Sequence, residues 1–143
     1  MNILEKLKSK DVTQILSACS EVAKCRDLDE LKMLSPHVNE IKKATKSISL
    51  GGALCPNSYH LDFAIKKLEH VKKDLGCLCA LYPENMFYNP VTEQQMALIA
   101  IDEVVKIDNK WIDYYLCRCA ACNSEFKVEE RDGHYTWWSW KRI

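Results

Sequence analysis

Residues 113–128 read DYYLCRCAACNSEFKV, and this stretch decides the fold of the C-terminal half. Aromatic and apolar residues stand on both sides of a short turn, which predicts a strand, a tight turn and a second strand. The turn holds Cys119 and Cys122, two residues apart, followed by Asn123. This is the spacing of a zinc knuckle, in which two thiolates and the backbone N–H groups of the turn face one ion. Because two thiolates are half of a tetrahedral site, the other ligands must lie elsewhere.

A second close pair of cysteines stands upstream, in the run Gly76-Cys77-Leu-Cys79. Two pairs on two turns predict a four-cysteine, zinc-ribbon-like site whose zinc ion is structural. The predicted ligands are Cys77, Cys79, Cys119 and Cys122. Two alternatives stay open: Cys117 shares a strand face with Cys119 and competes for a place, and His134 is a more distant substitute. Without a metal, the cysteines would be buried, reduced thiols.

The cysteine count alone does not separate metal ligands from disulfides. The chain has eight cysteines and begins MNILEKLK, which is charged and amphipathic and lacks the apolar core of a signal peptide. No segment has the length and apolar character of a membrane span. We therefore expect a cytoplasmic protein with reduced thiols and no membrane partner, in which paired cysteines bind metal.

Catalytic motifs are not found in the sequence. The four histidines are scattered, and no nucleophile elbow, Walker loop or dinucleotide-binding glycine run is present. Catalytic zinc usually has histidine or carboxylate ligands and an open position, neither of which the cysteine pairs predict. A redox role for Cys119 and Cys122 would need a helix after the pair, whereas a strand is predicted. We expect a protein that is not an enzyme.

Charge is balanced overall but differs between the two halves. Lysine and arginine number 20, and aspartate and glutamate also number 20. Residues 1–76 carry thirteen cations and ten anions (+3), and residues 77–143 carry seven and ten (−3). Neither half has the polybasic composition that drives nucleic-acid binding, so no direct contact with nucleic acid is expected.

Residues 1–76 show helical periodicity. Asp11 is a predicted N-cap for a helix over 12–25, a second segment starts after Asp27, and Ser35-Pro36 predicts a restart of that segment. A helix over 58–75 has a strong apolar stripe and is predicted to end at Gly76. The first two helices, with facing leucine-rich stripes, are typical of one HEAT-like repeat, which buries its apolar face only against neighbours. We expect this half to pack on the C-terminal sheet as one compact unit.

Residues 77–143 predict five short strands, mostly antiparallel, the first over 77–82. Asp108-Asn109 predicts one turn, and Asp132-Gly133 predicts a two-residue type I′ turn. Such a turn would pair Val128 with Trp137 and place both in the core. The opposite face would then carry Glu129, Trp138 and Trp140. This face is either covered by the helical half or exposed, and in the second case the three residues are candidates for binding a partner. The fold class expected for the whole chain is α+β, with HEAT-like antiparallel helices over 1–76 packed on a small zinc-ribbon-like antiparallel sheet over 77–143.

Several phrases of this sequence resemble a family of small bacterial proteins. They are EIKKATK from Glu40, LGGAL from Leu50, CLC from Cys77, FYNP from Phe87, CAAC from Cys119 and VEERDGHYTWWSW from Val128. The family is identified as immunity proteins of contact-dependent inhibition and similar polymorphic toxin systems. The resemblance implies a cytoplasmic antitoxin that binds and occludes a cognate, nuclease-type toxin domain. Asn123 departs from the glycine that usually follows such a knuckle, a mild change because Asn tolerates positive φ. The alternative is a zinc-ribbon module that binds nucleic acid or other proteins.

Overall fold

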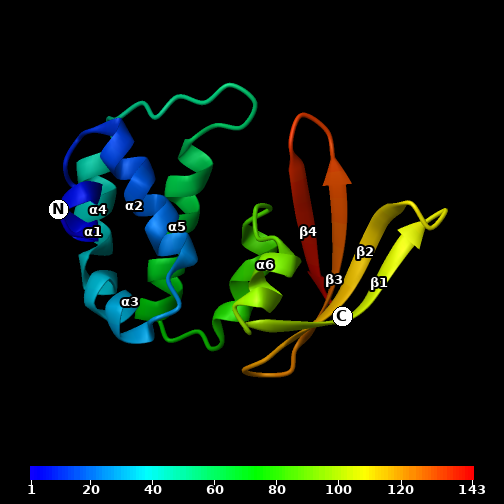
Figure 1. The fold of residues 1–143 in the computed structure, drawn as a ribbon. Coiled ribbons are helices and arrows are strands. Elements are labelled where there is room, and N and C mark those ends of the chain that lie inside the picture. The colour runs from blue at the N-terminus through cyan, green and yellow to red at the C-terminus, as the bar shows by residue number, and fades with distance from the viewer. The chain divides into compact units, whose positions relative to one another are not determined.

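The computed structural model describes residues 1–143 and has an α+β fold, as expected (Figure 1). Six α-helices, two short 3₁₀-helices and four β-strands form two compact units, residues 1–76 and residues 77–143. The first is called the helical unit and the second the sheet unit. The boundary falls where the hydrophobic periodicity of the sequence changes from helical to strand-like.

The helical unit consists of α1 (Ile3–Leu7), α2 (Val12–Lys24), α3 (Leu28–Leu34), η1 (Ser35–His37), α4 (Val38–Thr45) and α5 (Ser58–Lys72). The predicted N-cap of α2 is confirmed, because the Asp11 carboxylate accepts a hydrogen bond from the backbone N–H of Gln14. Asp27 caps α3 in the same way. Pro36 lies in the 3₁₀ turn that joins α3 to α4, so the predicted restart is also confirmed.

Helix α5 is the element that the other helices share. Helices α2, α3 and α4 all pack on it, while α1 packs on α2 (Figure 1). The fully buried residues Ile15, Val22, Leu31, Ile41 and Leu68 form the core. The HEAT-like pairing of α2 with the next helix is therefore not shown. With only seven residues, α3 has too short an apolar face to pair along α2, and both helices bury their stripes on α5 instead.

The end of α5 differs from the sequence prediction. The backbone N–H of Leu75 bonds to the carbonyl of His70, and that of Asp74 bonds to Val71, which is a Schellman motif. Asp74, with φ of 52°, takes the left-handed position that was predicted for Gly76. Gly76 also has positive φ, but it follows the motif and leads into the sheet unit.

Lys67 is a buried cation within the helical unit. Its side chain is only 1% exposed, and its ammonium donates to the carbonyls of Ala23 and Cys25 at 3.0 and 2.7 Å. These carbonyls belong to the C-terminal end of α2, where the helix dipole is negative. Lys67 of α5 thus supplies hydrogen-bond donors to carbonyls at the end of α2. In the sequence, Lys66, Lys67, Lys72 and Lys73 form the polar face of this helix, which is typical of a solvated surface, so the prediction of an exposed Lys67 was wrong.

The sheet unit begins with two short helices, η2 (Leu78–Glu84) and α6 (Pro90–Gln95), followed by β1 (Ile99–Ile107), β2 (Trp111–Cys119), β3 (Glu125–Asp132) and β4 (Thr136–Arg142). The strands form one antiparallel sheet in the order β1-β2-β3-β4 (Figure 1). The prediction of five strands was wrong, because residues 77–82 form a 3₁₀ turn. Asp108 and Asn109 both have φ of 54°, as the predicted β1–β2 turn requires.

The register of β3 with β4 also differs from the prediction. Asp132 pairs with Thr136, so the loop has three residues, and Gly133 does not have the positive φ of a type I′ turn. Val128 consequently pairs with Trp140 and not with Trp137. The shift is three residues, an odd number, so it exchanges the two faces of β4.

The core of the sheet unit is aromatic. The ring of Trp140 stacks on Tyr82 with centroids 4.1 Å apart, and Phe126 meets both rings edge-on. The indole N–H of Trp140 donates to the carbonyl of Tyr88 at 2.9 Å. Strand β4 is thereby fixed to the segment that follows η2. Trp138 strengthens this connection, because its backbone N–H donates to the carbonyl of Met86 at 2.8 Å.

Candidate metal centre

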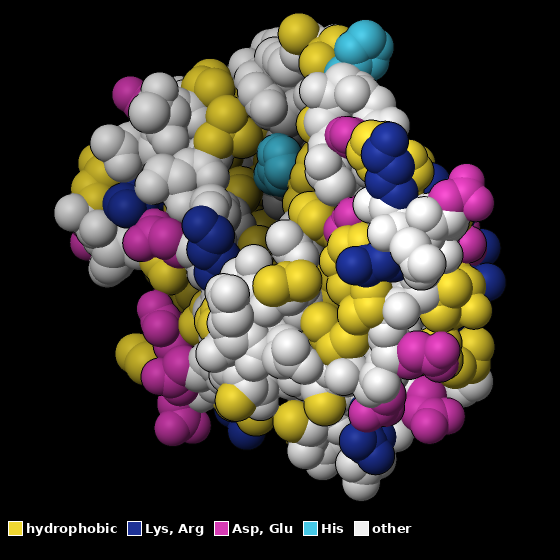
Figure 2. Space-filling model, turned by 45° about the vertical axis from the view of Figure 1, so that its right-hand side comes forward, with side chains coloured by type: hydrophobic (Ala, Val, Ile, Leu, Met, Phe, Trp, Pro, Cys, Tyr) yellow, Lys and Arg dark blue, Asp and Glu magenta, His cyan; other side chains and the backbone are white.

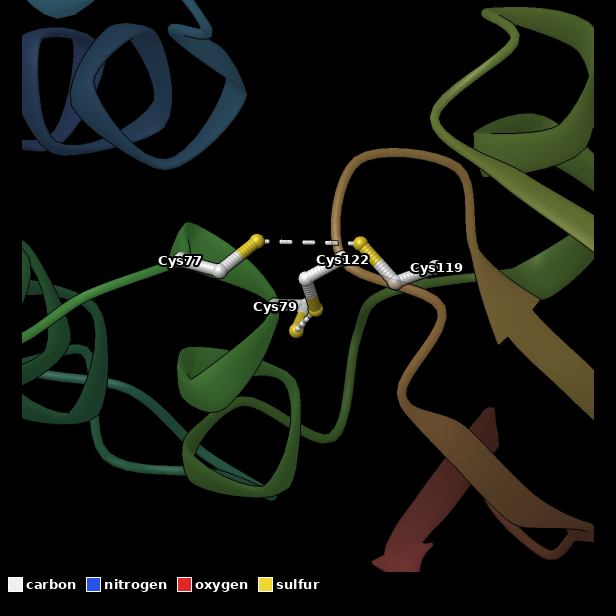
Figure 3. A group of neighbouring side chains, drawn as sticks. All are labelled: Cys77, Cys79, Cys119 and Cys122. Atoms are coloured by element: carbon white, nitrogen blue, oxygen red, sulfur yellow. Dashed lines mark hydrogen bonds between the residues drawn. The ribbon is translucent and has the colours of Figure 1, made fainter.

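Four thiols from two separate turns converge at one point in the sheet unit (Figure 3). The four Sγ atoms, of Cys77, Cys79, Cys119 and Cys122, all lie within 4.8 Å of one another. The Sγ atoms of Cys77 and Cys119 are 3.7 Å apart, and those of Cys79 and Cys122 are 3.4 Å apart. Each short distance joins the first turn to the second. The cluster therefore brings together two segments that are distant in the sequence.

The β2–β3 turn places Cys119 and Cys122 through its own backbone. The N–H of Cys119 bonds to the carbonyl of Ser124, and the N–H of Asn123 bonds to the carbonyl of Cys119. These bonds close the chain into a knuckle at the end of β2. Asn123 has φ of 62°, the left-handed conformation expected for the residue after the second cysteine. The predicted tight turn between two strands is confirmed.

The start of η2 places the other pair. Cys77 is the N-cap residue of η2, and its carbonyl accepts the N–H of Ala80. The backbone N–H of Cys79 donates to the Cys77 sulfur, and that of Ser124 donates to the Cys122 sulfur. In each turn, therefore, an amide two residues further on supports a thiolate.

The four thiols have different electrostatic surroundings. Burial raises the pKa of the Cys79 and Cys77 thiols above the ordinary value. Hydrogen bonds from Ser124, first from its hydroxyl and then from its N–H, lower the pKa of Cys122 to about 6. Cys79 and Cys119 are buried, Cys77 is half-buried and Cys122 is exposed. Solvent therefore reaches the cluster mainly at Cys122, while the other three thiols are buried or half-buried.

The donor set fits a metal ion. A tetrahedral site with Zn–S bonds of about 2.3 Å separates its sulfurs by roughly 3.8 Å. The cross-turn distances of 3.4 and 3.7 Å lie close to that separation and far from the roughly 2.05 Å of a disulfide. All four sulfurs lie within 4.8 Å of one another, so all four can be ligands of the same ion. The residues can hold one ion in a closed site.

The alternatives for the ligand set are resolved by position. Cys117 is buried outside the cluster, and burial, followed by the negative charge of Asp102, raises the pKa of its thiol to about 12. His134 lies in the β3–β4 loop and is not part of the cluster. Cys19 stands at helical spacing with Ile15 and Val22, which predicts a buried residue, and it does lie in the core of the helical unit, where burial raises its pKa to about 12.

The candidate partner-binding residues do not form one exposed face. Trp140 is 3% exposed and belongs to the core of the sheet unit, so of the two alternatives for this residue the structure shows the buried one. Trp138 shares the face of Trp140 and donates its indole N–H to Glu130. Glu129 lies on the other face, where its carboxylate binds Arg131 and Lys141. The error in placing Glu129 on the face of the two tryptophans follows directly from the register of the β3–β4 hairpin.

A different tryptophan is exposed. Trp111 is 64% exposed and pairs across the β1–β2 turn with Ile107, which is 50% exposed. We call these two residues the hairpin-tip pair. Sequence reasoning missed them, although Trp111 directly follows the Asp108-Asn109 turn, where neighbouring strands are too short to cover a side chain. On the face shown in Figure 2, hydrophobic, basic and acidic side chains are interspersed, with small groups of acidic side chains near the lower edge of the view.

Comparisons of the chain with protein-family models, with curated proteins and with solved structures found no match. None of the helices combines the length and the apolar character that crossing a membrane requires.

Proposed function

We propose that this protein is a non-catalytic immunity protein that binds a toxin domain in the cytoplasm and covers its active site. A structural zinc ion, held by the four-cysteine cluster, would give the zinc-ribbon-like sheet unit the rigidity that a binding surface needs. The resemblance of several phrases, among them those at Cys77, Cys119 and Val128, supports the immunity role. Zinc is proposed because a reduced tetrathiolate suits its tetrahedral, sulfur-tolerant coordination.

The observation that carries the proposal is the closed geometry of the four sulfurs. Catalytic zinc keeps a position open for water or substrate, whereas structural zinc has four protein ligands. Here all four Sγ atoms lie within 4.8 Å of one another and come from two turns. The ion would therefore crosslink the start of η2 to the end of β2. Such a role favours a binding protein over a metalloenzyme.

The hairpin-tip pair is the proposed contact surface. Exposed tryptophan is the side chain that most often dominates the binding energy of a protein interface. Trp111 and Ile107 stand beside Lys106, Asp108 and Lys110, so an apolar centre is surrounded by charges of both signs. The ammonium of Lys110 lies 5.5 Å from the centre of the Trp111 ring. A toxin active site with complementary charges would be recognised quickly and covered by this tip.

The test is protection of living cells. Deleting the gene in a strain that receives active toxin from neighbouring cells should stop growth, and the wild-type chain should restore it. Trp111→Ala should restore growth poorly, whereas Leu54→Ala, which removes an exposed side chain of the helical unit, should restore it fully. Normal growth of the deletion strain under proven toxin delivery would contradict the proposal.

The alternative function predicts a different measurement. A zinc-ribbon module for nucleic acid would bind DNA or RNA with an affinity that falls steeply with salt. On the sheet face of Glu129, Lys127 lies 4.5 Å from the Tyr114 ring, an arrangement that a nucleic-acid surface also uses. Lys141 and Arg131, however, are paired with Glu129 and thus partly neutralised. Tight, salt-dependent binding by the purified chain would favour the alternative.

A further inference from the structure

Cys122 is the ligand through which the metal centre meets the solvent. It is exposed, while Cys79 and Cys119 are buried and Cys77 is half-buried. Loss of a metal ion from a closed site requires one ligand to leave first. Buried ligands are held by the surrounding core, so departure begins where the side chain is free to rotate into water. What holds Cys122 in place therefore controls how fast the ion is lost.

Two side chains outside the four ligands act on Cys122. The hydroxyl oxygen of Ser124 lies 3.1 Å from the Cys122 sulfur. The guanidinium of Arg142 donates from Nη2 to that same hydroxyl oxygen. Because Arg142 occupies a lone pair of Ser124, the hydroxyl proton of Ser124 is directed away from Arg142 and is available to the sulfur. A metal-bound thiolate carries no proton, so Ser124 is the donor in that contact.

The backbone of Arg142 is fixed by its strand pairing in the sheet. Arg142 pairs with Phe126, the second residue of β3, whose side chain is fully buried. The backbone N–H of Ile143 donates to the carbonyl of Glu125 at 3.0 Å, which fixes the end of β4 next to the knuckle. Arg142 thus lies opposite Phe126, two residues after Ser124, at the end of the turn that carries Cys122.

From this geometry we infer that Ser124 and Arg142 are positioning residues of the metal centre, which keep Cys122 bound and slow the release of the ion. The inference rests on the metal centre proposed above. Four thiolates around a divalent ion leave two negative charges in excess, and a charge-assisted hydrogen bond to one sulfur offsets part of them. Removal of such an outer partner typically costs 10–100-fold in metal affinity.

The test uses the full chain loaded with zinc and follows transfer of the ion to a chromogenic chelator. Ser124→Ala and Arg142→Gln should each release zinc about ten-fold faster than the wild type, the lower end of that range. Ser124→Thr, which keeps the hydroxyl, should stay near the wild-type rate. Lys141→Gln is the matched control, because it removes a cation from the adjacent residue, which binds Glu129 on the opposite face.

A double variant separates a positioning role from a general loss of charge or stability. Since Arg142 acts through Ser124, the Ser124→Ala/Arg142→Gln chain should release zinc no faster than Ser124→Ala alone. Cobalt-loaded variants should keep the visible and charge-transfer bands of four-sulfur coordination, which shows that the ligands themselves are retained. If Ser124→Ala does not fold, Arg142→Gln measured against Lys141→Gln still decides.

Two outcomes would overturn the inference, and a third would overturn the proposal beneath it. Equal release rates for Arg142→Gln and Lys141→Gln would show that Arg142 has no particular role. Additive effects in the double variant would show that it does not act through Ser124. A wild-type chain that binds no zinc or cobalt would instead refute the metal centre itself.

Discussion

The helical unit and the sheet unit use cysteine and charge in opposite ways. Cys19 stands alone in the helical core as a small apolar residue, whereas four of the five cysteines of the sheet unit meet at one point. The buried charged side chain of the helical unit is Lys67, which donates hydrogen bonds to two backbone carbonyls at the end of α2. The sheet unit gathers thiols that become anionic on binding a metal. We therefore expect the helical unit to be stable without a metal, and the sheet unit to depend on the proposed ion.

The tryptophans allow this difference to be measured. All four, at positions 111, 137, 138 and 140, belong to the sheet unit, while the long helices belong to the helical unit. Tryptophan fluorescence thus reports the sheet unit, and circular dichroism at the helix minimum reports mainly the helical unit. The two signals, measured on one sample, therefore show which unit each substitution destabilises.

The largest effect is expected from Cys119→Ser. Structural zinc contributes about 10–16 kcal/mol in small zinc-binding peptides, comparable to the whole stability of a domain. The sheet unit should unfold, with a red shift of tryptophan fluorescence, while the helical signal stays; a chelator should do the same to the wild type. Cys55→Ser, outside the cluster, is the control. A Cys119→Ser chain with the wild-type fluorescence and melting temperature would contradict a structural metal.

The second effect compares two tryptophans of the same sheet. Trp140→Ala removes a ring stacked on Tyr82 and a hydrogen bond to Tyr88, and should lower the free energy of unfolding by about 3–5 kcal/mol. Trp111→Ala removes an exposed ring and should change it by no more than about 0.5 kcal/mol. Urea unfolding followed by the remaining tryptophans measures both. Equal losses would refute the register of β3 with β4.

The third effect belongs to the helical unit. Lys67→Met keeps the volume but removes the donor to two carbonyls at the end of α2, and should lower the free energy of unfolding by about 1–3 kcal/mol. Urea unfolding followed at the helix minimum gives the value. Lys66→Met, an exposed neighbour, is the matched control. A Lys67→Met chain as stable as this control would show that the carbonyls need no donor from α5.

The smallest effect is a pH dependence. A hydrogen bond from Lys42 lowers the pKa of Glu69 below its ordinary 4.5, so the pair stabilises the folded state at higher pH. That stabilisation is lost as the pH falls through the lowered pKa, where the folded carboxylate is protonated. The wild type should exceed Glu69→Gln by about 0.2–1 kcal/mol near neutral pH, since both partners are partly exposed.

Melts of both chains across the acid range test this prediction. The difference between the wild type and Glu69→Gln should shrink below pH 4.5 and disappear below the folded pKa. A difference that grows with acid would mean that the neutral carboxyl is the stabilising form. Tryptophan fluorescence should be the same in both chains, because the pair joins α4 to α5 within the helical unit.

Prediction from the sequence succeeded where neighbouring residues decide the structure. The N-cap at Asp11, the restart at Pro36, the turn at Asp108 and the tight turn at Cys119 all depend on a few consecutive residues. It failed where a distant segment decides. Lys67 reads as one of four lysines on a polar face, and only the end of α2, brought in by the fold, makes it a buried donor.

The four-cysteine cluster stands between these cases. The sequence by itself determined the two close pairs and the turn geometry that presents thiols, because spacing and positive-φ tolerance are local properties. It left Cys117 and Cys119 as rivals, since both fit one strand face. Tertiary structure decided between them: the strand carries Cys117 into the apolar core, while Cys119 ends the strand beside η2. It also decided which tryptophans are core, because stacking on Tyr82 and a three-residue loop fix the register of β4, and neither can be read from the hairpin's own residues.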